Sequence, residues 1–259
     1  MDTSYGIFCP VAKAAEVVAG RWTPLILSEL MKGSERFGDI QNGVPLMSRS
    51  LLARRLKEME FAGLIQRVPV GKGHVYRLTE SGNALRPLIN QLAEWGSEWR
   101  LPYLNERERN VSYLMWSLRG FLLGRTELPA RAVLQFNFRN VPKRDHKLRM
   151  WWLIKRDAEI DLCYTDMGFE PDVVIDADLD TLTRVAIGLA SLQKARSNGD
   201  VSFTGSAKLF ARFVAALDLV EPPKLRLMRV PSEPPPSQMM PPPAEVTAEA
   251  PVRTKSRAA

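Results

Sequence analysis

The sequence predicts two folded domains and a tail: a mainly helical N-terminal domain, an α+β domain with an antiparallel sheet covered by helices, and a disordered proline-rich segment. Apolar residues recur at helical spacing through the first hundred positions. Four segments between positions 130 and 178 instead alternate with a period of two, as half-buried antiparallel strands do. Ten of the nineteen prolines fall in 221–259, which holds too little apolar surface to offset the entropy of ordering. We therefore expect domains at 1–100 and 111–220, a linker at 101–110 and a disordered tail at 221–259.

The composition is that of an ordinary globular protein, with 45% hydrophobic and 25% charged residues. A net charge of +7 and a pI near 9.6 favour an anionic partner, either nucleic acid or a membrane surface. Two cysteines, Cys9 and Cys163, fit a reducing compartment better than a disulfide scaffold. No apolar run approaches the roughly 20 residues of a membrane span, and the N-terminus lacks the features of a signal peptide. We expect a cytoplasmic protein.

The helix around which the N-terminal domain is organised is bounded by Ser48 and Gly63. Ser48 can cap its N-terminus, and Gly63 can end it because glycine adopts the left-handed conformation without steric cost. Leu52, Leu56 and Met59 recur at spacings of four and three, so they should share one buried face.

The opposite face of this helix carries Ser50, Arg54 and Lys57, with Arg49 on its flank. A helix with an apolar back and such a front can enter a DNA major groove, where Arg and Lys reach guanine edges and phosphates. Residues 45–78 contain seven Lys or Arg against two Glu, so much of the positive charge of the chain lies in this segment. The alternative is a solvated amphipathic helix, because basic helices are common.

A β-hairpin is expected directly after this helix. Residues such as Ile65, Val68 and Val75 flank Gly71-Lys72-Gly73, a turn sequence with a basic tip. A basic hairpin in this position is typical of a wing, which contacts phosphates beside the groove, although an ordinary hairpin would have the same pattern. Apolar stripes over 11–31 predict two helices, and a short helix or tight turn at 36–40 completes the order of a helix-turn-helix domain.

Four stretches of this domain together resemble the HxlR family of bacterial winged-helix transcription regulators. They are Cys9-Pro10, GRWTPLILSELMKGSERFGDI, SRSLLARRLKEMEFAGLIQR and YRLTESGNALRPLINQLAEWG. The similarity extends from residue 9 to about residue 100. The resemblance implies a dimeric DNA-binding protein that acts as a repressor or an activator.

The resemblance also implies which residues contact DNA. The groove-facing helix would be lined by Ser48, Arg49, Ser50, Arg54 and Lys57. Wing contacts would lie near Lys72 and His74, although the sequence of this wing departs from the usual pattern of the family.

A helix with a broad apolar stripe is expected from Thr79 to about Trp99, with a bend at Pro87. A stripe this wide needs a partner, which is either the core of the domain or, as the resemblance implies, a second subunit packed along this helix and the 11–19 helix. We expect a homodimer. In some relatives a cysteine near position 9 senses oxidants through its thiolate, which makes Cys9 a candidate redox sensor; the alternative is a small apolar residue in the dimer contact.

The second domain begins with a strongly apolar helix, Val111–Gly124. Strands are expected at 130–139, 148–155, 159–164 and 172–178, then a helix capped by Asp178, a strand at 199–205 and a last helix capped by Ser206.

This order of elements, together with Asp-Leu-Asp-Thr-Leu and the Gly-Asp-x-x-x-x-Gly ending, resembles the sterol carrier protein type two domain over residues 110–219. The resemblance implies an apolar ligand pocket between sheet and helices, lined by Leu134, Phe136, Phe138, Trp152, Ile154, Phe210 and Phe213. The alternative is that these side chains fill a solid core, and an alternating strand cannot distinguish the two.

An enzyme is not expected. The histidines, His74 and His146, lie in separate domains, and the sequence has no metal-ligand cluster, phosphate-binding glycine loop or nucleophile elbow. We therefore expect no cofactor and no metal. We expect a bacterial transcription regulator that binds double-stranded DNA as a homodimer and responds to an apolar small molecule or lipid in its C-terminal domain. The alternative is a lipid-carrier or dimerisation module tethered to DNA without a ligand switch.

Overall fold

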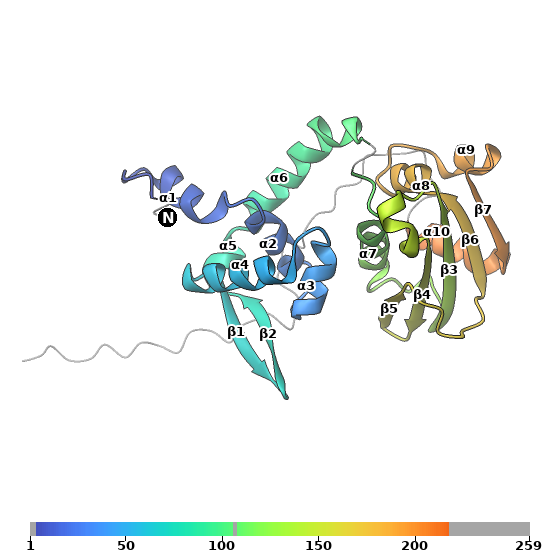
Figure 1. The fold of residues 1–259 in the computed structure, drawn as a ribbon, viewed down its shortest axis with the longest axis horizontal. Helices are drawn as coiled ribbons and strands as arrows, with labels where there is room; N and C mark the ends of the chain where they lie inside the picture. Colours follow the sequence, from blue (N-terminus) through green and yellow to red (C-terminus); the bar gives the residue numbers. More distant parts are fainter. Residues whose placement is uncertain (1–3, 106–107, 218–259) are drawn as a thin grey trace, which may run out of the picture.

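The computed structural model describes residues 4–105 and 108–217, so the tail expected at 221–259 lies outside the described residues. A helical N-terminal domain is followed by a C-terminal α+β region (Figure 1). Within the described ranges, no helix is long and apolar enough to cross a membrane.

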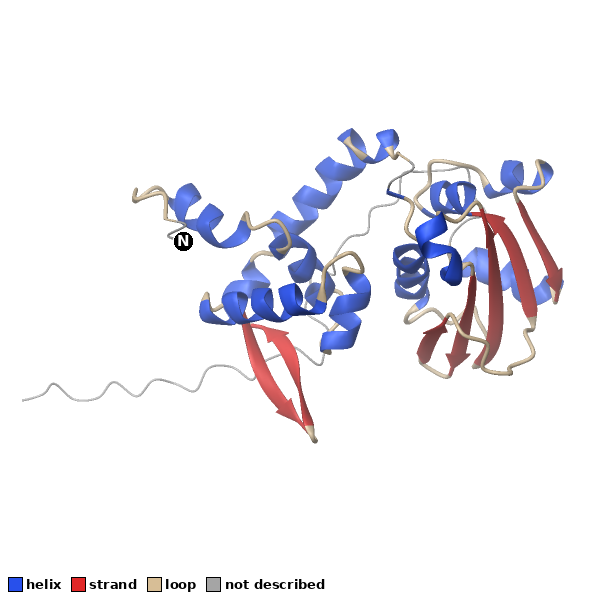
Figure 2. Ribbon diagram, viewed as in Figure 1, coloured by secondary structure: helices blue, strands red, loops and turns tan. Residues whose placement is uncertain are grey.

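The N-terminal domain consists of helices and one β-hairpin. In chain order its elements are α1 (Pro10–Val18), α2 (Thr23–Met31), α3 (Phe37–Gly43), α4 (Arg49–Phe61), β1 (Ile65–Val70), β2 (Gly73–Leu78), α5 (Glu80–Ala84) and α6 (Arg86–Trp99), followed by a short 3₁₀ turn, Leu101–Tyr103. The strands pair antiparallel from Ile65 opposite Leu78 to Val70 opposite Gly73, which leaves Gly71-Lys72 as a two-residue tip. Gly71 has φ +57°, a conformation that suits glycine. Figure 2 shows this hairpin projecting from the helices.

Helix α4 has the boundaries and the buried face that its sequence predicts. The Ser48 side chain accepts a hydrogen bond of 3.3 Å from the backbone N–H of Leu51 at the N-terminus. Leu52, Leu56 and Met59 are buried in the core of the domain. Burial of these three side chains fixes the rotation of α4, so its opposite face points to solvent.

The prediction of a single bent helix from Thr79 to about Trp99 is wrong. The segment forms two helices, α5 and α6, separated at Leu85, with Pro87 in the first turn of α6. Proline lacks the N–H that a helix interior requires, whereas in the first turn that group has no helical partner to lose.

The C-terminal region has helix α7 (Val111–Leu122) and strands β3 (Arg131–Arg139), β4 (Met150–Arg156), β5 (Glu159–Cys163), β6 (Val173–Asp178) and β7 (Val201–Gly205). A 3₁₀ turn, Lys143–Leu148, precedes β4. Helices α8 (Leu179–Ala186) and α9 (Leu192–Ser197) lie between β6 and β7, and α10 (Ala207–Ala216) follows β7. As expected, Asp178 caps α8 and Ser206 caps α10.

The sheet is mixed rather than antiparallel, which corrects the expectation. Its strand order is β5-β4-β3-β6-β7, and β3 pairs parallel with β6 while the other neighbours pair antiparallel. Strands β3, β4 and β5 form a meander, after which the chain crosses over to the free edge of β3. A crossover, unlike a hairpin, brings the next strand in parallel.

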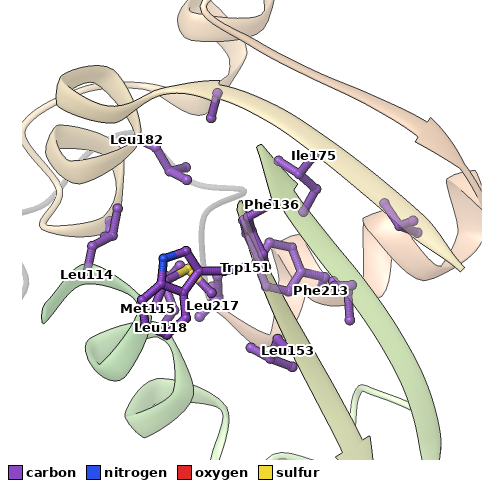
Figure 3. Packing of buried hydrophobic residues seen from close by; sticks show 14 of the residues in the cluster. Leu114, Met115, Leu118, Phe136, Trp151, Leu153, Ile175, Leu182, Phe213 and Leu217 are labelled. Carbon is purple, nitrogen blue, oxygen red and sulfur yellow. The ribbon is translucent and has the colours of Figure 1, made fainter. Parts of the chain in front are cut away.

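The main core lies between one face of this sheet and the helices α7, α8 and α10, which all contribute to one cluster. Figure 3 shows Met115 and Leu118 of α7 together with Trp151 and Leu153 of the sheet in this cluster. Phe136 is fully buried, with its ring centroid 5.8 Å from that of Phe213.

Trp152 and Ile154 lie on the other face of the sheet, which corrects the set of residues expected to line one pocket. They cluster with Val133 and the partly buried Phe169, from the crossover between β5 and β6. The register explains this placement. Leu134 is opposite Leu153, and residues directly opposite on paired strands share a face.

Candidate nucleic-acid interface

The exposed face of α4 presents the residues predicted to contact DNA. Ser48, Ser50, Arg54 and Lys57 are all exposed. The Ser48 and Ser50 hydroxyls lie 3.2 Å apart at the N-terminal end of the helix. Short polar side chains at this end leave room for a phosphate backbone or a base edge to approach the helix closely.

Arg49 is held at the start of α4 by an aromatic ring of α3. Its guanidinium carbon lies 5.0 Å from the ring centroid of Phe37, a cation–π geometry. Helix α3, which precedes α4 in the chain, therefore orients one of the cations of α4.

The acidic residues of α4 lie toward its C-terminal end. Glu58 accepts a hydrogen bond of 2.6 Å from Arg55 and lies 3.6 Å from the guanidinium of Arg54. These contacts are exposed and contribute little to stability, but they leave the first turns of α4 with an excess of positive charge.

In the β1–β2 hairpin, Lys72 is exposed at the tip, whereas His74 is half-buried. The Nδ1 atom of His74 lies 3.0 Å from Nη2 of Arg67, and its Nε2 atom lies 3.2 Å from the Tyr76 hydroxyl. Because a guanidinium can only donate, Nδ1 accepts this hydrogen bond. His74 thus positions Arg67.

Arg67 is a further candidate contact, which was not among the residues predicted from the sequence. It lies on β1, is exposed, and is oriented by His74 from the paired strand. The available signal was the alternation of β1, which places Arg67 on the face opposite Val68. The helix α4 and this hairpin together present cations at two places, as needed for simultaneous contact with a groove and the flanking phosphates.

Cys9 is exposed and immediately precedes α1. The nearby ammonium of Lys13 is 3.0 Å from the carboxylate of Glu16, so it already has an anionic partner. The role of Cys9 as a redox sensor stays a prediction.

The remaining residues of the predicted apolar pocket lie in the core between the helix-covered face of the sheet and helix α10. Leu134, Phe136, Phe138, Phe210 and Phe213 all belong to the main core cluster. Phe210 stacks on Phe203 with 3.9 Å between ring centroids. Phe213 also packs against Phe136, so these aromatic side chains contact one another between the sheet and the helices.

Helices α1 and α6 expose large apolar side chains. On α6, Leu88, Leu92, Trp95 and Trp99 follow spacings of four, three and four, and Trp95 is 57% exposed. Beside the start of α1, Phe8 is 97% exposed. Soluble monomers rarely leave apolar patches of this kind uncovered, which favours a protein partner for this face.

Comparison with known proteins places the similarity in the N-terminal domain. A family model described as HxlR-like helix-turn-helix matches residues 17–103. The uncharacterized HTH-type transcriptional regulator YvaP of Bacillus subtilis (strain 168) is 37% identical over 95 residues, covering 35% of this chain and 88% of that protein. The HTH-type transcriptional regulator YodB of the same organism is 35% identical over 98 residues, covering 36% and 88%.

A third relative, the uncharacterized HTH-type transcriptional regulator Rv3095 of Mycobacterium tuberculosis (strain H37Rv), is 42% identical over 94 residues, covering 34% of this chain and 58% of that protein. Among solved structures, the reduced form of YodB from B. subtilis is 32% identical and covers 37% of this chain and 98% of that chain, with a TM-score of 0.33. The C-terminal α+β region begins after the segment that the family model matches.

Proposed function

The chain belongs to the HxlR-like family of helix-turn-helix transcriptional regulators, and on this premise we propose that it binds double-stranded DNA as a homodimer through α4 and the β1–β2 hairpin. Ser48, Arg49, Ser50, Arg54 and Lys57 contact the major groove. Lys72 and Arg67, the latter oriented by His74, contact flanking phosphates.

The rotation of α4 is the observation that supports this proposal most strongly. Leu52, Leu56 and Met59 are each 3% exposed or less, so the helix cannot turn without exposing its apolar face. Arg54 and Lys57 therefore stay on the solvent side, where a duplex can approach. The β1–β2 hairpin presents further exposed cations, Arg67 and Lys72, beside this face.

We propose that the exposed apolar faces of α1 and α6 form the interface of the homodimer, where they pack against a second copy of the chain. A two-fold axis along this face would present two α4 helices to one duplex. Such a dimer recognises two half-sites about one helical turn apart, in inverted orientation.

For the C-terminal region we propose a ligand-binding role like that of sterol carrier domains. Its element order supports the proposal: a helix, a three-stranded meander, a crossover strand, two helices, a strand and a last helix. The ligand would lie among the aromatic side chains between the sheet and the helices. Extraction of the purified protein and mass spectrometry would test this, and a lipid-free extract would favour the alternative of a tethered module without a switch.

A binding selection tests DNA recognition directly. The full chain would be incubated with a random-sequence duplex library, and the bound duplexes sequenced. We expect enrichment of an inverted repeat with half-sites separated by one helical turn. Equal retention of all sequences would contradict recognition of a specific operator.

A further inference from the structure

Two faces of helix α7 have different surroundings. Leu114, Met115 and Leu118 point into the main core of the C-terminal region. Another face of α7 lines a pocket together with residues of the N-terminal domain. This face carries Tyr113, Trp116, Ser117 and Gly120, at spacings of three, one and three. A helix that is apolar on nearly every side must bury or shield more than one face.

This pocket lies between the two parts of the chain and has a volume of about 300 Å³. The N-terminal domain contributes Glu29, Lys32 and Ser34, from α2 and the residues after it. From α7 and the residues that follow it come the apolar side chains of Phe121 and Leu123. Pockets at domain interfaces with mainly apolar walls and a few converging polar groups are typical sites for small ligands, and this volume is at the lower end of their range.

A buried carboxylate joins the two parts at this pocket. Glu29 is 4% exposed. One of its oxygens accepts a hydrogen bond of 2.9 Å from the indole N–H of Trp116, and the other lies 2.8 Å from the ammonium of Lys32. Gly43 of α3 makes room for this arrangement, because a Cβ atom at position 43 would overlap the carboxylate of Glu29.

The charged groups of the pocket carry a net positive charge. Burial acts to lower the pKa of Lys32, but the carboxylate of Glu29 and, to a smaller extent, Tyr113 outweigh burial and raise this pKa above its usual value. Arg119 is the second cation: its guanidinium carbon lies 4.6 Å from the ring centroid of Trp116, and its Nε donates to the carbonyl of Ile160. Glu29 balances only one of these two charges.

We propose that this pocket binds a small aromatic monoanion, such as an aromatic carboxylic acid. The anionic group lies beside Lys32, whose ammonium has three donors and gives one of them to Glu29. The aromatic ring lies among Tyr113, Phe121 and Leu123. This site is separate from the helix-covered face of the sheet, where the sterol-carrier resemblance places a ligand.

Gly120 provides a test that leaves the fold intact. A Cβ atom at this position would meet no other heavy atom within 4 Å, and alanine and tryptophan both have a higher helix propensity than glycine. Gly120→Trp would fill the pocket, whereas Gly120→Ala adds only a methyl group and serves as the matched control.

Binding would be measured by calorimetry on the full chain without DNA, with 1-naphthoate as the probe and 1-naphthylmethanol as its neutral counterpart. We expect the carboxylate to bind at least tenfold more tightly than the alcohol. Gly120→Trp should weaken naphthoate binding at least tenfold, Gly120→Ala by less than about twofold, and Lys32→Gln should remove the preference for the carboxylate. Equal affinity of the wild type and Gly120→Trp, or no heat with naphthoate at millimolar concentration, would overturn the proposal.

A second measurement concerns regulation and rests on the proposed function. Because Glu29 lies on α2 of the DNA-binding domain, a ligand with different affinities for the free and DNA-bound forms would change DNA affinity by the same factor. We expect naphthoate to shift the DNA affinity of the wild type and not that of Gly120→Trp. A protein that binds naphthoate but no DNA would contradict the proposed function and leave the site intact, whereas a protein that binds DNA but no naphthoate would contradict the site alone.

Discussion

The indole N–H of Trp116 donates a hydrogen bond of 2.9 Å to the buried carboxylate of Glu29, and this bond joins the C-terminal region to the DNA-binding domain. Removing the donor leaves a buried carboxylate oxygen with one partner fewer, and a hydrogen bond to a charged group contributes about 1.5–3 kcal/mol. We expect Trp116→Phe to lower the free energy of unfolding by this amount. In a double-mutant cycle with Glu29→Ala, measured by chemical denaturation, the two losses should be coupled, and strict additivity would contradict the contact.

Gly82 is predicted to be intolerant of any side chain. A Cβ atom at position 82 would overlap the backbone carbonyl oxygen of Leu64, which cannot move without displacing the start of β1. We expect Gly82→Ala to lower the free energy of unfolding by about 1–3 kcal/mol, the usual range for overpacking. Gly120→Ala, which meets open space, should be neutral or stabilising. Equal effects of the two substitutions on the thermal midpoint would contradict this packing.

The exposed face of α6 is predicted to form the interface of the proposed homodimer. Leu92 is 47% exposed in the protomer, and a carboxylate buried there against a second copy would be strongly unfavourable. Light scattering should give a dimer for the wild type and a monomer for Leu92→Glu. Met167→Glu is the control, because Met167 is an exposed apolar residue of the C-terminal region. A dimeric Leu92→Glu variant would place the interface elsewhere.

Asp178 makes the stability of the C-terminal region depend on pH. Burial acts to raise its pKa, but hydrogen bonds of 2.8 Å from the Thr181 backbone N–H and 2.7 Å from the Asn140 side chain outweigh this and hold the pKa below 3.8. A depressed pKa contributes stability above the pKa of the unfolded chain, and this stability is lost as the pH falls through the folded value.

Asp178→Asn keeps an N-cap but removes the titration. Between pH 6 and pH 3, its free energy of unfolding should therefore fall less steeply than that of the wild type. Identical slopes in urea titrations across this range would show that Asp178 has the same pKa folded and unfolded.

The sequence predicts the local features of this fold well where one face of an element is clearly polar. In α4 the apolar and basic residues separate cleanly, so the burial of Leu52, Leu56 and Met59 was predicted correctly. In β4, by contrast, Met150-Trp-Trp-Leu-Ile154 is apolar at every position because the crossover covers the second face of the sheet. The sequence of β4 then does not show which residues face the helices, and Trp152 and Ile154 were assigned to the wrong face of the sheet.

Contacts between segments far apart in the chain could not be predicted either, because no local residue pattern identifies the two partners. The parallel pairing of β3 with β6 depends on where the chain crosses the sheet, and no residue pattern records that path. The link between Glu29 and Trp116 joins positions 87 residues apart. Its only local signal was a carboxylate within the apolar sequence of α2, which indicates a buried partner without identifying it.

The most direct test of DNA recognition by the basic face of α4 is the double variant Arg54→Ala with Lys57→Ala. The control is the double variant Lys143→Ala with Lys147→Ala, because Lys143 and Lys147 are exposed cations of the C-terminal region. Both pairs remove two positive charges, so only position differs. On the selected duplex, in a titration repeated at several salt concentrations, the α4 pair should weaken binding at least tenfold. It should also reduce the slope of log K against log salt concentration by about two if both contact phosphates. The control pair should change binding by less than about twofold. Equal losses from the two pairs would contradict the assignment of α4 as the DNA-reading helix.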